Sequence, residues 1–157
     1  QVSMVNTQQS KFIEIVKNAQ SKNLGAANDM VRGGLLATRS KAICGLLQSK
    51  RISAWTGSVD NVDSNSDGLG VLSVEIAEDV FVKTWNNALS DISDNTLLQP
   101  DSQIFADASV LKKGQKVNFS GSFISGKHCL QESSMTLKGK LSEPEFLFKF
   151  STISGAR

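Results

Sequence analysis

The chain has 157 residues, the length of one domain or of one domain with an appended segment. It is 39% hydrophobic and 20% charged, as is ordinary for a globular protein, and no apolar run approaches the roughly 20 residues that a membrane-spanning helix needs. The 17 basic and 15 acidic residues give a net charge of +2, too small to indicate nucleic-acid binding by itself. We expect these charges to be interspersed over a solvated surface.

The first part of the chain, residues 1–49, is predicted to be helical. Apolar residues recur at helical spacing over Phe12–Val31, and Thr7 is a candidate cap for the first helix. The pair Gly33–Gly34 predicts a break or a bend, followed by a second helix over about 35–49.

From residue 50 onward, the hydrophobic residues alternate with polar ones, which is typical of strands with one buried face. Six strands are predicted, of which five or six would form the sheet: about 51–62, 70–78, 80–86, 115–125, 133–139 and 145–153. A short helix is predicted near 101–110, with Asp101 or Ser102 as its cap. We therefore divide the chain into a helical segment, 1–49, and a β-strand segment, 50–157.

The segment between the first two predicted strands resembles a calcium loop. Four of its residues fit the first half of an EF-hand loop: Asp63, Asn65, Asp67 and Gly68. The twelfth position is Val74, however, and the carboxylate of Glu75 comes one residue late. These residue types are also the ones that turns require. The sequence therefore favours a hairpin turn, and neither a metal nor a cofactor is predicted.

The two cysteines, Cys44 and Cys129, are far apart in sequence, and with the single histidine, His128, they do not supply enough ligands for a zinc site. They are either two thiols in a reducing compartment or one long-range disulfide in an exported protein. The chain begins at Gln1 rather than at a methionine, as a processed protein or a trimmed chain would. We favour the disulfide and a periplasmic or otherwise exported protein, with the cytoplasm as the alternative.

Several stretches resemble a known fold. "ISAWTGSVDNVDSNSDGLGVLSVEIA" (52–77) resembles the opening hairpin of OB domains with its G-x-V step, and "LKKGQKVNFSGSF" (111–123) resembles their later strand after a loop glycine. "VKTWNNALSDI" (82–92) and "EPEFLF" (143–148) resemble segments of bacterial proteins, without an activity attached. Over about 50–153 the chain is thus similar to exported bacterial OB-fold proteins and to the family named for its likeness to tRNA-anticodon-binding modules.

The resemblance implies an α+β fold in which N-terminal helices pack on a small five- or six-stranded Greek-key barrel. OB domains bind oligonucleotides, oligosaccharides or protein segments on the face of strands two and three, flanked by loops. The resemblance thus implies a non-catalytic binding protein that engages a protein or an envelope-derived ligand. The candidate ligand-binding residues are Phe81, Lys83, Trp85 and Asn87, with Asp67 and Lys127 in the loops at the rim.

Two alternatives remain for this face. The set Val80, Val82 and Thr84 would line the barrel, so Phe81, Lys83 and Trp85 would point outward, unless the N-terminal helices cover them. The runner-up function is binding of single-stranded oligonucleotides, against which the 6% aromatic content and the absence of tyrosine count.

An enzymatic function is not predicted. A divergent OB-fold nuclease would need clustered carboxylates and arginines, which the strands lack. His128 and Cys129 are adjacent, and adjacent residues on a strand point to opposite faces, so they would not form a nucleophile pair. No catalytic residues are therefore predicted.

Overall fold

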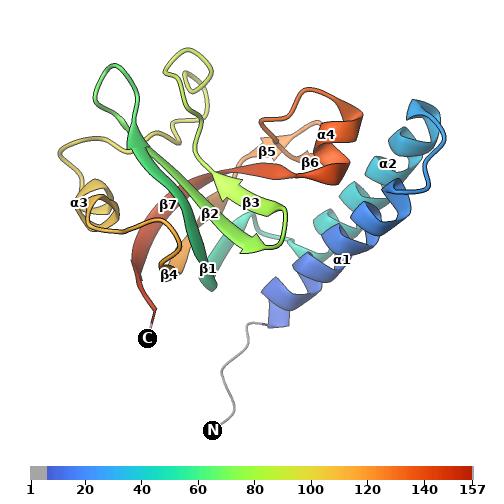
Figure 1. Cartoon of the computed structure of the whole chain (residues 1–157), viewed down its shortest axis with the longest axis horizontal. Coiled ribbons are helices and arrows are strands. Elements are labelled where there is room, and N and C mark those ends of the chain that lie inside the picture. The colour runs from blue at the N-terminus through green and yellow to red at the C-terminus, as the bar shows by residue number, and fades with distance from the viewer. Residues whose placement is uncertain (1–6, 157) are drawn as a thin grey trace, which may run out of the picture.

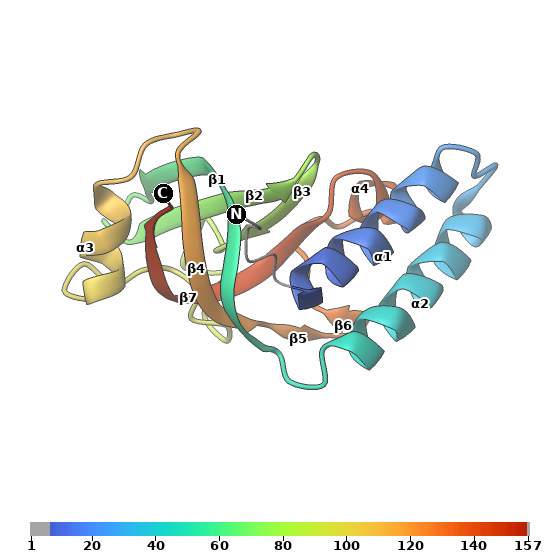
Figure 2. The ribbon, with the colours of Figure 1, turned by 90° about the horizontal axis from the view of Figure 1, so that it is seen from below.

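The computed structural model describes residues 7–156, and Gln1 lies outside them. It is an α+β structure, in which a sheet lies between a helical hairpin at one end and a short helix at the other (Figures 1 and 2). The helices are α1 (Thr7–Asn23), α2 (Asp29–Leu46), α3 (Gln103–Ser109) and α4 (Leu137–Ser142). The strands are β1 (Arg51–Ser64), β2 (Gly70–Ala77), β3 (Val80–Lys83), β4 (Lys116–Phe123), β5 (Ser125–Gly126), β6 (Cys129–Leu130) and β7 (Glu145–Gly155). Among residues 7–156, no helix is both long and apolar enough to cross a membrane.

Five of the strands pair into one closed ring. Its order is β1-β2-β3-β7-β4, and β4 pairs with β1 to close it. The β3–β7 pairing is parallel, whereas the other four pairings in the ring are antiparallel. The first three strands, β4 and β7 agree with the predicted strands to within a few residues.

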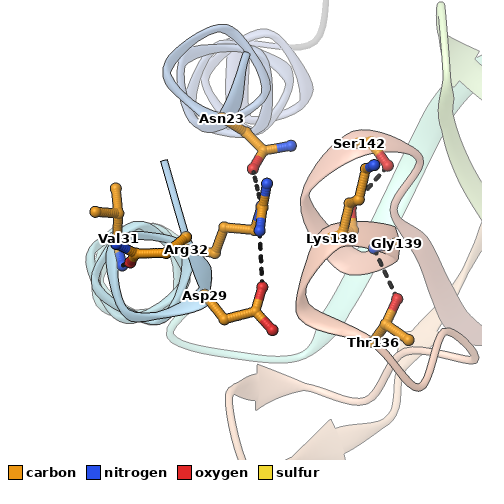
Figure 3. Close-up of polar contacts among 9 residues, drawn as sticks. Asn23, Asp29, Val31, Arg32, Thr136, Lys138, Gly139 and Ser142 are labelled. Carbon is orange, nitrogen blue, oxygen red and sulfur yellow. Dashed lines mark hydrogen bonds and ion pairs between the residues drawn. The ribbon is translucent and has the colours of Figure 1, made fainter. Parts of the chain in front are cut away.

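The predicted strand over 133–139 is wrong. This part of the β4–β7 connection follows the small β5–β6 hairpin and leads into α4. Thr136 caps α4, because its Oγ1 accepts a hydrogen bond from the backbone N–H of Gly139 at 3.0 Å (Figure 3). Leu137 and Leu141 are four residues apart and pack beside α1 and α2, which is a helical rather than a strand spacing.

The predicted break at Gly33–Gly34 is also wrong, because α2 runs through both glycines. The chain turns earlier, and Asn28 begins α2 by accepting a hydrogen bond from the N–H of Val31 at 3.0 Å. A glycine inside a helix costs only about 1 kcal/mol, which a cap and a buried helix face can offset.

The helical hairpin shares a hydrophobic core with the sheet. Phe12 of α1 lies with its ring centroid 5.2 Å from that of Trp55, 5.4 Å from that of Phe123 and 5.2 Å from that of Phe146. Trp55 is fully buried. In addition, the side-chain amide of Gln9 accepts a hydrogen bond from the backbone N–H of Thr56 and donates one to its carbonyl. Helix α1 therefore closes one end of the ring.

Two glycines of the quoted stretches lie where strands approach closely. A Cβ on Gly57 would be 2.6 Å from Cγ1 of Val74, and a Cβ on Gly121 would overlap the carbonyl oxygen of Lys149. Strands β1 and β4 can therefore curve against their neighbours only because these positions lack a side chain.

Helix α2 is fastened to the β4–β7 connection. The predicted disulfide between Cys44 and Cys129 is present, with a Cα–Cα distance of 5.8 Å. Arg39 and Glu132 form an ion pair nearby, with 2.5 Å between Nη2 and Oε2. The helical hairpin is thus joined to the strands by packing, by a covalent bond and by a buried charge pair.

Candidate functional site

The stretch that resembled a calcium loop is the tip of the β1–β2 hairpin. The Oδ1 atom of Asn65 accepts hydrogen bonds from the backbone N–H groups of Asp67, at 2.9 Å, and Leu69, at 3.0 Å. Gly68 has a φ of +80°, which glycine adopts without strain. Glu75 lies away from this tip. Its Oε2 accepts a hydrogen bond from the backbone N–H of Asp79 at the β2–β3 turn. The side chains therefore build a turn.

The two faces of β3 differ as the sequence predicts. Val80, Val82 and Thr84 are fully buried. Phe81, Lys83 and Trp85 alternate with them and are half-buried, so they lie on the outer face of the sheet.

Helix α1 meets this sheet at the β2–β3 turn. There the ammonium group of Lys17 donates to the carbonyl of Glu78, and Gln20 donates to the carbonyl of Asp79. These two hydrogen bonds from α1 are made to the turn that precedes Phe81. Lys83 and Trp85 lie further along the chain from that turn.

Phe81 lies between two carboxylates. In the register of the sheet it is opposite Glu75 on β2 and opposite Glu145 on β7. Directly paired residues point to the same face, so Glu75 and Glu145 both lie on the outer face, on either side of Phe81. Ser133 holds Glu145 in place by donating its hydroxyl to Oε1 at 2.6 Å.

Trp85 carries a carboxylate partner of its own. Its indole Nε1–H donates to Oδ2 of Asp94 at 2.7 Å, and its backbone N–H donates to Oγ1 of Thr96 at 2.8 Å. The loop that follows β3 therefore folds back onto Trp85. Asn87 lies in this loop, exposed, and its Oδ1 accepts from the N–H of Ser90 at 2.8 Å.

The six predicted site residues do not form one cluster. Phe81 and Lys83 lie on β3, and Trp85 follows two residues after the end of that strand. Asp67 is at the tip of the neighbouring hairpin, which projects beside the loop after β3 in Figure 1. Lys127 belongs to the β5–β6 turn, on the side of the molecule where the disulfide joins that turn to α2.

The charged residues are not interspersed along the chain as expected, and the segment that carries the candidate site is rich in acidic residues. Between Ile52 and Leu111 there are ten aspartate and glutamate residues and one basic residue, Lys83. The totals of 15 acidic and 17 basic residues leave five acidic and sixteen basic ones elsewhere. The acidic segment contains β2, β3, α3 and nearly all of β1. Strands β2 and β3 therefore belong to an acidic segment of the chain, which a count of charge along the sequence would have found.

A second charged cluster surrounds the disulfide. The side chains of Arg39 and Glu132 are each 1% exposed, and Arg39 also donates to the carbonyl of Lys140 at 2.8 Å. Burial raises the pKa of Glu132 above 4.5, against the opposing effects of Arg39 and Lys140. Burial also lowers the pKa of Arg39, while its pairing with Glu132 acts in the opposite direction.

His128 borders this cluster. Its pKa is lowered below 6.5 by partial burial and then by the positive charges of Lys140, Lys127 and Arg39. The neighbouring Cys129 is in a disulfide, so its sulfur is not a thiolate that His128 could activate. Across residues 7–156, no three His, Cys, Asp or Glu side chains are grouped to hold a metal ion.

The outer face of β3 therefore combines two partly exposed aromatic rings with several carboxylates, an arrangement suited to binding a cation or a basic side chain. Comparisons with protein-family models, with curated proteins and with solved structures each give no match to this chain.

Proposed function

We propose that the protein is a non-catalytic binding module of the OB type, which captures a basic segment of a partner protein on the outer face of β2 and β3. The ring order supports the OB assignment, because it runs first, second, third, fifth and fourth strand, with α3 between the third and the fourth. The disulfide supports an exported protein, because such bonds persist in oxidising compartments.

The position of Phe81 between Glu75 and Glu145 carries the proposal. A lysine or arginine side chain above the ring would gain a cation–π contact and would be paired with the carboxylates at the same time. Such contacts are worth about 0.5–2 kcal/mol each, depending on how far the site excludes water.

The acidic segment that contains β2 and β3 argues against single-stranded nucleic acid as the ligand. Proteins that bind single strands combine stacking aromatics with a positively charged groove. Here Lys83 is the one basic residue between Ile52 and Leu111, and the carboxylates around Phe81 would repel phosphates.

Fluorescence anisotropy with three labelled probes would test the proposal. The probes are a peptide of about ten residues that contains arginine and lysine, a glutamate-containing peptide of equal length, and a single-stranded oligonucleotide. We expect binding of the basic peptide alone, weakened by added salt. Phe81→Ala should reduce its affinity about tenfold. Binding of the oligonucleotide in place of the basic peptide would contradict the proposal.

A matched pair of double variants separates the site from overall charge. Glu75→Gln with Glu145→Gln removes two carboxylates beside Phe81, whereas Asp101→Asn with Asp107→Asn removes two near α3. The first pair should weaken the basic peptide strongly, and the second should do so only slightly, because distant charges are screened. Equal losses would mean that the peptide responds to net charge rather than to this site.

A further inference from the structure

The loop between β3 and α3 displays two large apolar side chains to solvent. Leu89 is 79% exposed and Ile92 is 69% exposed, and both lie within the turn that follows Trp85. Scattered apolar residues on a surface are normal, so the pair needs a second observation before it indicates binding.

That observation is the hydrogen bonding that fixes the loop. Asp91 lies between the two apolar residues, and it is only 7% exposed. Its Oδ1 accepts from the N–H of Thr96 at 2.6 Å and from the Oγ1–H at 2.7 Å, and its Oδ2 accepts from the N–H of Leu97 at 2.9 Å. A buried carboxylate with three donors fixes the backbone on either side of it, so Leu89 and Ile92 are held outward in a defined arrangement.

The end of the loop is fastened to the sheet as well. Gly70 of β2 and Leu98 exchange two backbone hydrogen bonds, of 2.8 and 2.9 Å. Together with the hydrogen bond from Trp85 to Asp94, they hold the loop beside the β1–β2 hairpin (Figure 1). The apolar pair therefore belongs to a loop that directly follows Trp85 and is fastened to the sheet.

The charges around the pair indicate which surface it meets. No lysine or arginine occurs over 84–111, and Asp94 is in the loop itself. Asp63 and Asp67 lie on the hairpin beside it. Docking on an anionic lipid surface relies on basic residues around the inserted apolar ones. The acidic residues around Leu89 and Ile92 therefore favour a protein partner with basic residues over an anionic membrane.

We propose that Leu89 and Ile92 form the second half of a two-part recognition edge. The partner segment places a basic residue over Phe81 and packs an apolar residue on Leu89 and Ile92. Phe81 and Trp85, after which the loop begins, are four residues apart, which is about 13 Å along an extended chain. An extended ligand would therefore need at least about four residues between its basic and its apolar contact. This inference rests on the proposed function, because it shares the site at Phe81.

Three peptides would test the spacing. The first carries only the basic residues, the second adds a leucine about five residues away, and the third places that leucine beside the basic residues. The second should bind about tenfold more tightly than the other two, because it alone can bury apolar surface on the loop. Equal affinity of the second and third peptides would overturn the inference.

Variants of the protein locate the effect. Leu89→Ser with Ile92→Ser should abolish the gain from the distant leucine and leave the basic peptide unaffected. The control is Val110→Ser, which removes an apolar side chain that is 75% exposed at the end of α3; it should retain the gain. A gain that persists in the double variant would overturn the inference.

The outcomes distinguish this inference from the proposed function. If the basic peptide binds and depends on Phe81 but the distant leucine adds nothing, only the two-part edge is wrong. If the basic peptide fails to bind at all, both are wrong. Sedimentation would also show whether the protein associates with itself. If it does, and if Leu89→Ser with Ile92→Ser abolishes this association, the apolar pair contacts a second copy of the chain and the inference is overturned.

Discussion

Arg39 and Glu132 are 93 residues apart in sequence and form an ion pair with almost no access to solvent. Two of their atoms, Nε of Arg39 and Oε1 of Glu132, have no hydrogen-bond partner within the described residues. The guanidinium carbon also lies 5.2 Å from the centroid of the Phe146 ring. The pair thus connects α2, the β4–β7 connection and the core of the ring.

Removing one member of this pair should destabilise the protein strongly. Arg39→Met leaves Glu132 buried without a partner, and we expect a loss of about 3–5 kcal/mol in the free energy of unfolding by urea. Arg39→Met with Glu132→Leu should recover most of that loss, because no charge remains buried. The control is Arg32→Met at the more exposed pair with Asp29, with an expected loss of about 1 kcal/mol or less. A double variant as unstable as the single one would contradict this account.

The one histidine should titrate below its ordinary pKa of 6.5. Burial and the charges of Lys140 and Lys127 disfavour its protonated form, so Lys140→Gln should raise the pKa of His128. Because the folded-state pKa is lowered, the unfolded state binds more protons between that value and 6.5, and stability should rise with pH across this window. NMR titration of the single imidazole measures the pKa directly. A value above 6.5, or no change in Lys140→Gln, would show that these lysines do not act on it.

Reduction of the disulfide should weaken the fold. Cys44 and Cys129 are 85 positions apart in sequence, and closing so long a loop is worth about 4.6 kcal/mol in the chain-entropy model. The midpoint of urea unfolding should therefore fall when a reductant is present. Cys44→Ala with Cys129→Ala should start at the lower midpoint and show no response to the reductant. If the midpoint of that variant also fell with the reductant, the reductant would act on something other than this disulfide.

Two glycines should respond in opposite ways to the same substitution. Gly121→Ala places a methyl group against the carbonyl oxygen of Lys149, and should cost about 3 kcal/mol or more. Gly34→Ala in α2 meets nothing within 4 Å, and should stabilise the helix by about 0.5–1 kcal/mol. Thermal unfolding of the two variants, side by side, tests whether the close approach of β4 and β7 is as described. Equal effects would argue against it.

Phe12 should be essential to the sheet as well as to α1. Phe12→Ala removes contacts to Trp55, Phe123 and Phe146, and should cost about 3–5 kcal/mol. Helical and tryptophan-fluorescence signals should then be lost in one transition, because both parts share a core. Two separate transitions would show that the helices and strands unfold independently.

The alternation of residues allowed much of the sheet to be predicted. Along β3, Val80 and Val82 face the core while Phe81 and Lys83 face outward, as a period of two requires. The helix cap at Ser102 was also predictable, because its hydroxyl accepts from the N–H of Phe105 through purely local geometry.

The errors arose where tertiary contacts outweigh local preference. Gly33 and Gly34 suggested a break, but α2 continues because Leu36 is buried against α4. The Arg39–Glu132 pair has no local signal, since nothing in the sequence indicates which charges meet across 93 residues. The hydrogen bond from Trp85 to Asp94 also had no local signal, because it depends on how the following loop folds back.

The position of Phe12 also constrains how the chain can be made. Phe12 and one of its ring partners, Phe146, are 134 residues apart in sequence. During synthesis, the apolar face of α1 therefore lacks this contact until β7 has emerged. Closure of the ring is dominated by contacts between distant parts of the sequence, and folding should therefore be slow.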